Sequence, residues 1–122
     1  MELDTSGGLD AAFNVGAGFP GPVLALATAG TSVYVGGVFG TYRGGSATCV
    51  AKLDKTTGAL DTTFSPPGAG LNGFPNPAYE YINAFAISGS SLLLCGDFNR
   101  YRGAAPPRRN AVAVNLVSGA LQ

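Results

Sequence analysis

The chain has 122 residues with seven basic and seven acidic side chains, and it contains neither histidine nor tryptophan. Its 19 glycines and 8 prolines favour a turn-rich β protein over a helical one. The balanced, low charge excludes the basic stripe of a nucleic-acid-binding protein, and the missing histidines remove the commonest general base and catalytic-metal ligand. No run of about 20 apolar residues exists, so we expect no membrane insertion.

The N-terminal block, LDTSGGLDAAF at residues 3–13, lacks the basic and apolar regions of a signal peptide. Its last residues, 9–13, predict a short β-strand. The block recurs as LDKTTGALDTTF from Leu53 and as VNLVSGALQ from Val114, so the chain begins and stops at nearly the same phase of a repeat. We therefore expect the natural protein to be longer than this chain.

Short strands separated by tight turns are predicted after this block. VLALAT alternates two faces that are both apolar, so this strand should be buried between neighbouring sheets. No window shows the period of an amphipathic helix, and no helix is expected. The predicted strands are 23–28, 32–37, 48–54 and 59–64, with a hairpin turn at 28–32 and a polar, glycine-ended loop at 41–45.

The same pattern occurs twice in the chain. Residues 23–45 align without gaps with residues 82–104, and the identical pairs include Gly37/Gly96, Phe39/Phe98, Tyr42/Tyr101 and Arg43/Arg102. Four short strands per repeat fit one blade of a β-propeller. The predicted fold is therefore an all-β propeller unit over residues 1–122, with one four-stranded blade at 9–59 and a second at 60–122.

The repeat can be written as LDxxF, then VxAxA, then a glycine pair followed by Phe, and then a Tyr-Arg-Gly loop. The segments that carry it are Leu60–Phe64, Gly36–Phe39, Tyr42–Gly44, Cys95–Phe98 and Tyr101–Gly103. In this order they resemble the delta-60 repeat family, a β-propeller-like repeat of large bacterial secreted and surface proteins. The resemblance implies a propeller fold and an extracellular or cell-surface location, with no agreed ligand and no catalytic residue.

Two positions depart from the family pattern. Val38 stands after the glycine pair of the first copy, where the second copy has the usual acidic residue, Asp97. Cys95 replaces the first glycine of the pair in the second copy.

Two blades cannot close a ring, because propellers typically use about four to eight blades. Either these blades belong to a longer array, or copies of the chain assemble. In an assembly, the N-terminal strand at 3–13 would complete a blade of a neighbouring chain, which makes a head-to-tail ring. Three chains would supply about six blades and four would supply about eight, and we favour a homotrimer.

The chain offers no constellation of catalytic or metal-binding residues, so it is predicted not to be an enzyme and to need no cofactor. Asp10 and Asp61 share a repeat position and are expected to cap turns through backbone N–H groups. Cys49 and Cys95 lie in different strands of different blades. They are expected to act as small apolar residues, with a disulfide as the alternative.

Repeated polar positions are candidate ligand contacts. Tyr42 with Arg43, and Tyr101 with Arg102, each follow the second strand of a copy. A tyrosine face can stack on a sugar ring, and an arginine fork can grip hydroxyls or carboxylates. Alternatively, the tyrosines pack the base of the loop while the arginines stay solvated. Asp97, the acid after the glycine pair, completes this candidate set.

The two copies differ most between the fourth strand of one blade and the first strand of the next. NVGAGFPGP at 14–22 corresponds to the longer SPPGAGLNGFPNPAYEY at 65–81. In repeat arrays an insertion maps to a loop on one face, often the binding face. Its candidate contact residues, Phe74, Tyr79, Glu80 and Tyr81, suit a glycan or peptide surface, or else they cover a seam between subunits.

Two functions are compatible with these observations. The first is a non-enzymatic binding or adhesion module of a larger extracellular bacterial protein that recognises a glycan or surface polymer. The second is a purely structural, self-assembling propeller or spacer domain without a ligand, because every strongly recurring residue also has a packing explanation.

Overall fold

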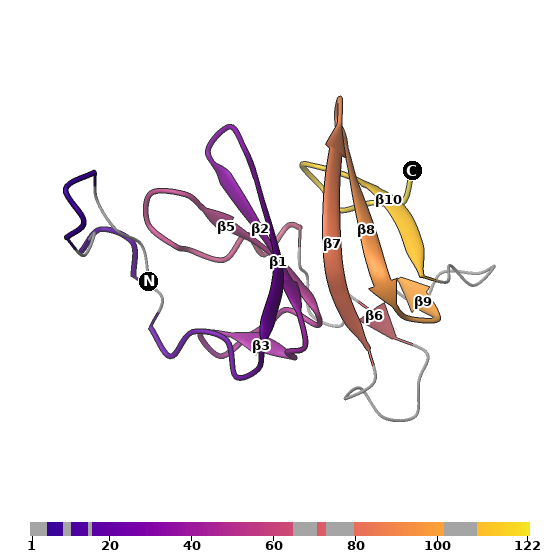
Figure 1. The fold of residues 1–122 in the computed structure, drawn as a ribbon, viewed down its shortest axis with the longest axis horizontal. Coiled ribbons are helices and arrows are strands. Elements are labelled where there is room, and N and C mark those ends of the chain that lie inside the picture. Colours follow the sequence, from indigo (N-terminus) through magenta and orange to yellow (C-terminus); the bar gives the residue numbers. More distant parts are fainter. Residues whose placement is uncertain (1–4, 9–10, 15, 65–70, 73–79, 102–109) are drawn as a thin grey trace.

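The structure of this chain, a computed structural model, is all-β in the residues that it describes, which are 5–8, 11–14, 16–64, 71–72, 80–101 and 110–122. Two three-stranded antiparallel sheets, sheet 1 and sheet 2, lie side by side, with two short two-stranded ribbons at their edges (Figure 1). The all-β class predicted from the sequence is confirmed. Within the described ranges the strands form no closed sheet.

Sheet 1 contains β1 (Val23–Ala29), β2 (Ser32–Gly37) and β5 (Val50–Asp54) in the order β1-β2-β5. The turn between β1 and β2 holds Gly30 at a φ of 57°. Glycine adopts this left-handed backbone without steric cost, and such a turn matches the twist of the two strands. These three strands and the turn were predicted from the sequence.

Sheet 2 contains β7 (Tyr81–Ser88), β8 (Ser91–Asp97) and β10 (Ala111–Asn115) in the order β10-β8-β7. Its first two strands form a hairpin, and its third strand pairs with the middle one, as in sheet 1. The second copy of the repeat therefore folds into the same antiparallel arrangement as the first.

The two copies agree even in their irregular positions. A register shift follows Val23 in β1, and the equivalent shift follows Ile82 in β7. The residue before the third strand is left-handed in both sheets, at Cys49 (φ 62°) and Asn110 (φ 64°). The sequence repeat is thus a structural repeat at the level of single backbone angles.

The fourth strand predicted for each blade, at 59–64 in the first copy, is not formed. A single isolated bridge stands in its place, Leu53–Leu60 in the first copy and Val114–Leu121 in the second. The carboxylate of Asp61 accepts the backbone N–H groups of Thr63 and Phe64 at 2.9 and 3.2 Å. This turn directs the chain away from sheet 1. Among the described residues, each sheet has three strands rather than four.

The predicted N-terminal strand at 3–13 lies partly outside the described residues. Residues 5–8 and 11–13 form turns and bends, whereas residues 3–4 and 9–10 lie outside the described residues. Pairing of this segment with a neighbouring chain stays a prediction.

The polar loop predicted at 41–45 is a small hairpin in which β3 (Thr41–Tyr42) pairs with β4 (Gly45–Ser46). Arg43 at its tip has a φ of 50°. A second ribbon pairs β6 (Leu71–Asn72) with β9 (Arg100–Tyr101).

Each sheet has two faces, because directly paired residues of neighbouring antiparallel strands point to the same side. In sheet 1, face A consists of Ala25, Ala27, Tyr34, Gly36, Val50 and Lys52, and face B consists of Leu26, Thr28, Val33, Val35, Ala51 and Leu53. In sheet 2, face A consists of Ala84, Ala86, Leu93, Cys95, Ala111 and Ala113, and face B consists of Phe85, Ile87, Leu92, Leu94, Val112 and Val114. The two faces A occupy equivalent repeat positions, as do the two faces B.

The main core lies between face A of sheet 1 and face B of sheet 2, where β1 and β2 lie against β7 (Figure 1). Its members Tyr34, Ile82, Leu92, Leu94 and Val114 are all 2 % exposed or less. Full burial of each such aliphatic side chain stabilises the fold by about 1.5–3 kcal/mol. The two equivalent sheets therefore stack in the same sense, with face A of one against face B of the next.

Candidate functional site

The two repeated tyrosines are core residues rather than open ligand contacts. Tyr42 and Tyr101 are both 0 % exposed. The Tyr42 hydroxyl donates a hydrogen bond of 2.7 Å to the carbonyl of Gly58, and the Tyr101 hydroxyl donates one of 2.9 Å to the equivalent carbonyl of Gly119. Neither ring presents a face on which a sugar can stack. The packing alternative holds, and each tyrosine ties its ribbon to the turn after the third strand.

Arg43, at the tip of the β3–β4 hairpin, is exposed, and its backbone N–H donates to the carbonyl of Gly18 at 3.2 Å. Burial raises the pKa of the Tyr42 hydroxyl, and the Arg43 guanidinium opposes this effect in part. The Arg43 side chain therefore acts on the Tyr42 hydroxyl, its neighbour in the predicted ligand-contact pair.

The other candidate contacts lie on sheet 2 or outside the described residues. Tyr81 and Asp97 are cross-strand neighbours, the first half-buried and the second exposed. Glu80 is 2 % exposed, and its backbone carbonyl accepts a hydrogen bond from the Cys49 thiol at 3.3 Å. Phe74, Tyr79 and Arg102 lie outside the described residues. The structure thus brings Tyr81 and Asp97 together, while Arg43 lies on a ribbon beside sheet 1.

Both cysteines are free thiols, so the disulfide alternative is not formed. Burial raises the pKa of Cys49 to about 11, and the nearby Glu80 adds to this rise against a backbone hydrogen bond from Phe39. A thiol with this pKa is protonated at neutral pH and is a poor nucleophile. Cys49 acts as a small buried residue, as predicted, whereas Cys95 is half-buried on face A of sheet 2.

The Lys52 ammonium of sheet 1 contacts residues in the turns that follow the third strands. Lys52 and Asp61 form an ion pair of 3.1 Å, and the Lys52 ammonium also donates to the carbonyl of Val117 at 3.4 Å. The described residues contain no group of three or more acidic, cysteine or histidine side chains placed to hold a metal ion. In the same part of the chain, no helix has the length and apolar character needed to cross a membrane.

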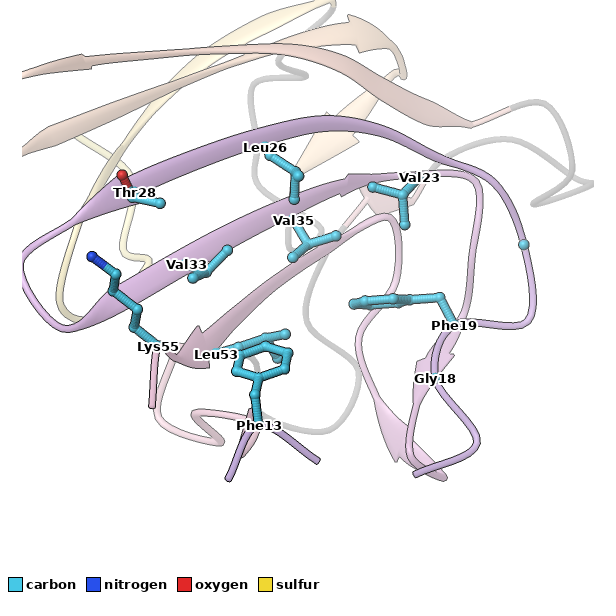
Figure 2. Close-up of a pocket in the computed structure, with 11 residues that line it drawn as sticks. Phe13, Gly18, Phe19, Val23, Leu26, Thr28, Val33, Val35, Leu53 and Lys55 are labelled. Carbon is cyan, nitrogen blue, oxygen red and sulfur yellow. The ribbon is translucent and has the colours of Figure 1, made fainter. Parts of the chain in front are cut away.

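An apolar hollow of about 550 Å³ opens on face B of sheet 1. Figure 2 shows the rings of Phe13 and Phe19 opposite Val33, Val35 and Leu53 of the sheet. The chain before β1 folds back over this face, which brings the two phenylalanines to the rim. The hollow is therefore built from the repeat itself together with the N-terminal segment.

The side chains of β1 leave this hollow open to solvent. Leu26 is 66 % exposed, and Val23 and Leu24 are 43 % and 48 % exposed. Of the lining residues, Thr28 and Lys55 bring polar side chains. The hollow therefore offers apolar contact rather than acid–base or nucleophilic chemistry.

The hollow was not predicted from the sequence, although the apolar residues of β1 are a signal for it. VLALAT was predicted to be buried on both faces, which is wrong: in the structure only its alanines, on face A, pack against the main core. Leu26, on the other face, is open. Exposed apolar side chains that gather at the rim of an apolar hollow mark a candidate contact surface. Face B of sheet 1 is therefore the candidate functional site.

Comparison with models of protein families, with curated proteins and with solved structures finds no match. The resemblance to delta-60 repeats therefore stays a prediction from the sequence.

Proposed function

We propose that this chain is a non-enzymatic, self-assembling structural repeat module, whose two sheets are blades of a β-propeller that the blades of further copies complete. The observation that carries the proposal is the part of face B of sheet 1 that lies on β1, where Leu26 is 66 % exposed at the hollow. Val35 and Leu53 on the same face are buried, because Phe13 and Phe19 pack there. The two faces B occupy equivalent repeat positions, but in the described part of the chain only face B of sheet 2 has a sheet stacked on it.

The burial of two candidate ligand contacts also supports assembly. Tyr42 and Tyr101, the most regular of them, are buried and hydrogen-bonded within the fold. Their recurrence in each copy has a packing reason, as expected of a module whose repeats are built to stack.

Recognition of a glycan or surface polymer, and an extracellular location, stay predictions from the sequence. Such recognition would have to use exposed groups such as Arg43 and Asp97, which lie beside different sheets. Assembly has the better support, because it accounts for the largest exposed apolar side chains of sheet 1.

Sedimentation velocity on three versions of the chain tests the proposal. We expect the unmodified chain to sediment as an assembly and Leu26→Lys to sediment as a single folded chain, because a charge would be buried in the interface. Val117→Lys is the matched control, since Val117 is 69 % exposed and lies on neither face. If all three versions sediment as the same species, face B of sheet 1 is not an assembly surface.

A further inference from the structure

We propose that face B of sheet 1 is covered by face A of sheet 2 from a second copy of this chain. This inference rests on the proposed assembly function and names its partner. It assigns the hollow lined by Phe13, Phe19 and Leu26 to a head-to-tail contact between identical chains.

The contact inside the chain is the template for the contact between copies. Face A of sheet 1 packs on face B of sheet 2. Among the described residues no further sheet stacks on face A of sheet 2 or on face B of sheet 1, although Phe13, Phe19 and the β3–β4 hairpin cover part of the latter. The two sheets share strand order, register shift and left-handed positions. Repeating the internal stacking once more therefore places face A of one copy on face B of another.

The side-chain volumes of the two open faces complement each other. Inside the chain, Gly36 lies so close to sheet 2 that an added Cβ would be 2.6 Å from Ile82 Cγ2 and 2.7 Å from Phe85 Cζ. The residue equivalent to Gly36 in sheet 2 is the larger Cys95.

The residues that Cys95 would meet in a second copy are smaller than the ones that Gly36 meets inside the chain. The equivalents of Ile82 and Phe85 in sheet 1 are Val23 and Leu26. An increase in volume on one face is thus matched by decreases at the two positions that would receive it. Packed cores tolerate volume-conserving exchanges and reject uncompensated ones, so this match is what a contact between copies requires.

The rest of face A of sheet 2 fits an apolar hollow. Leu93 is 38 % exposed and stands among small residues, with Ala84, Ala86 and Ala111 around it. Its equivalent in sheet 1 is Tyr34, which reaches across the internal interface and donates to the carbonyl of Leu116 at 2.7 Å. Leu93 has no polar side-chain atom, so the hydrogen bond that Tyr34 makes inside the chain would not be repeated between copies.

The N-terminal segment supplies Phe13, the equivalent of a residue that packs between the two sheets inside the chain. Inside the chain, Phe64 fills the seam between the sheets and meets the Tyr34 ring edge-on, with centroids 5.6 Å apart. The equivalent of Phe64 is Phe13, which packs on face B of sheet 1 at the rim of the hollow. Its partner in the assembly would be Leu93 of the second copy.

Each copy offers one face without a stacked sheet of each kind, face B of sheet 1 and face A of sheet 2. The contact is therefore between unlike surfaces and extends head to tail. Such contacts close into a ring when the rotation between units fits. A ring of blades needs about four to eight of them, which corresponds to two to four copies of a two-blade chain.

Disulfide trapping tests this contact in the full chain. The variant Val23→Cys, made together with Cys49→Ser, leaves Cys95 as the only native thiol. In the internal template, the Cβ built on Gly36 lies 2.9 Å from the Cβ of Ile82. A slight widening of that spacing reaches the about 3.5–4.5 Å of a disulfide. We expect mild oxidation to link position 23 of one copy to Cys95 of another.

Val117→Cys in the same Cys49→Ser background measures chance collisions. We expect the position 23 variant to crosslink about tenfold faster or more, because docking raises the effective thiol concentration. A second readout needs no new cysteine, since alkylation of Cys95 in the Cys49→Ser chain should slow as protein concentration rises.

The outcomes separate this inference from the proposed function. A disulfide between position 23 and Cys95 of different copies, together with protection of Cys95, supports the inference. An assembly in which Cys95 stays reactive and crosslinks no faster than the control overturns the head-to-tail contact and leaves the assembly function standing. A chain that stays monomeric over the whole concentration range overturns both.

Discussion

Gly36 lies at the tightest point between the two sheets, and its substitution by alanine tests whether the sheets stack as described. An alanine Cβ would be 2.6 Å from Ile82 Cγ2, 2.7 Å from Phe85 Cζ and 2.9 Å from Ile82 Cβ. Ile82 is 0 % exposed and lies in the main core. The phenyl ring can tilt, but the Cβ of Ile82 moves only with its strand.

The expected cost follows from this overlap. An extra methyl group in a packed core destabilises by about 1–3 kcal/mol. Replacing glycine with alanine also restricts the unfolded chain and returns about 0.4–1 kcal/mol. We therefore expect Gly36→Ala to lower the free energy of unfolding by about 1–2 kcal/mol.

Urea denaturation at one fixed protein concentration measures this loss. Gly40→Ala is the matched control, because a Cβ at Gly40 meets no atom within 4 Å. We expect the control to stay within about 0.5 kcal/mol of the unmodified chain. If Gly36→Ala is as stable as Gly40→Ala, the two sheets do not pack at the described distance and the template for assembly is lost.

Three further results are expected. Gly36→Cys should lower the free energy of unfolding by about 1–3 kcal/mol. Adding Ile82→Val and Phe85→Leu should recover much of this loss, because the triple variant copies the side chains of the two open faces. If the triple variant is no more stable in urea than Gly36→Cys alone, the volume match is refuted. Tyr42→Phe should cost about 1–3 kcal/mol in thermal unfolding, because it leaves a buried carbonyl without its donor, and an unchanged melting temperature would contradict that role. Burial raises the pKa of Asp61, but the N–H groups and the ammonium that it contacts outweigh this and hold the pKa below its ordinary value. Its contribution is therefore present above about pH 4 and lost as pH falls through the folded-state pKa, and Asp61→Asn should flatten the acid side of a stability–pH profile.

Much of the fold was predictable because alternation and turn chemistry act locally. The strand and hairpin pattern around Gly30 depends on near neighbours, and the structure follows it. The prediction of a fourth strand was wrong because two incompatible structures, a strand and a capped turn, were predicted for residues 59–64. Asp61 was expected to cap a turn, and it does. Its side chain takes the N–H groups that a strand at 59–64 would have used.

The site was harder to predict, because burial depends on distant residues. The Tyr42 hydroxyl finds its acceptor in a turn after the third strand, at Gly58, and only the folded chain shows that the ring is enclosed. Likewise, the two apolar faces of VLALATA predict burial on both sides. Within one chain, a sheet covers face A, while Leu26 stays open on face B.

The most direct test of assembly is the solution mass of the unmodified chain, measured by light scattering over a dilution series. We expect a mass that stays at a fixed small multiple of the chain mass, with three copies favoured, because a ring satisfies every face A and every face B. A mass equal to one chain at every concentration would contradict it, as would open-ended growth with concentration.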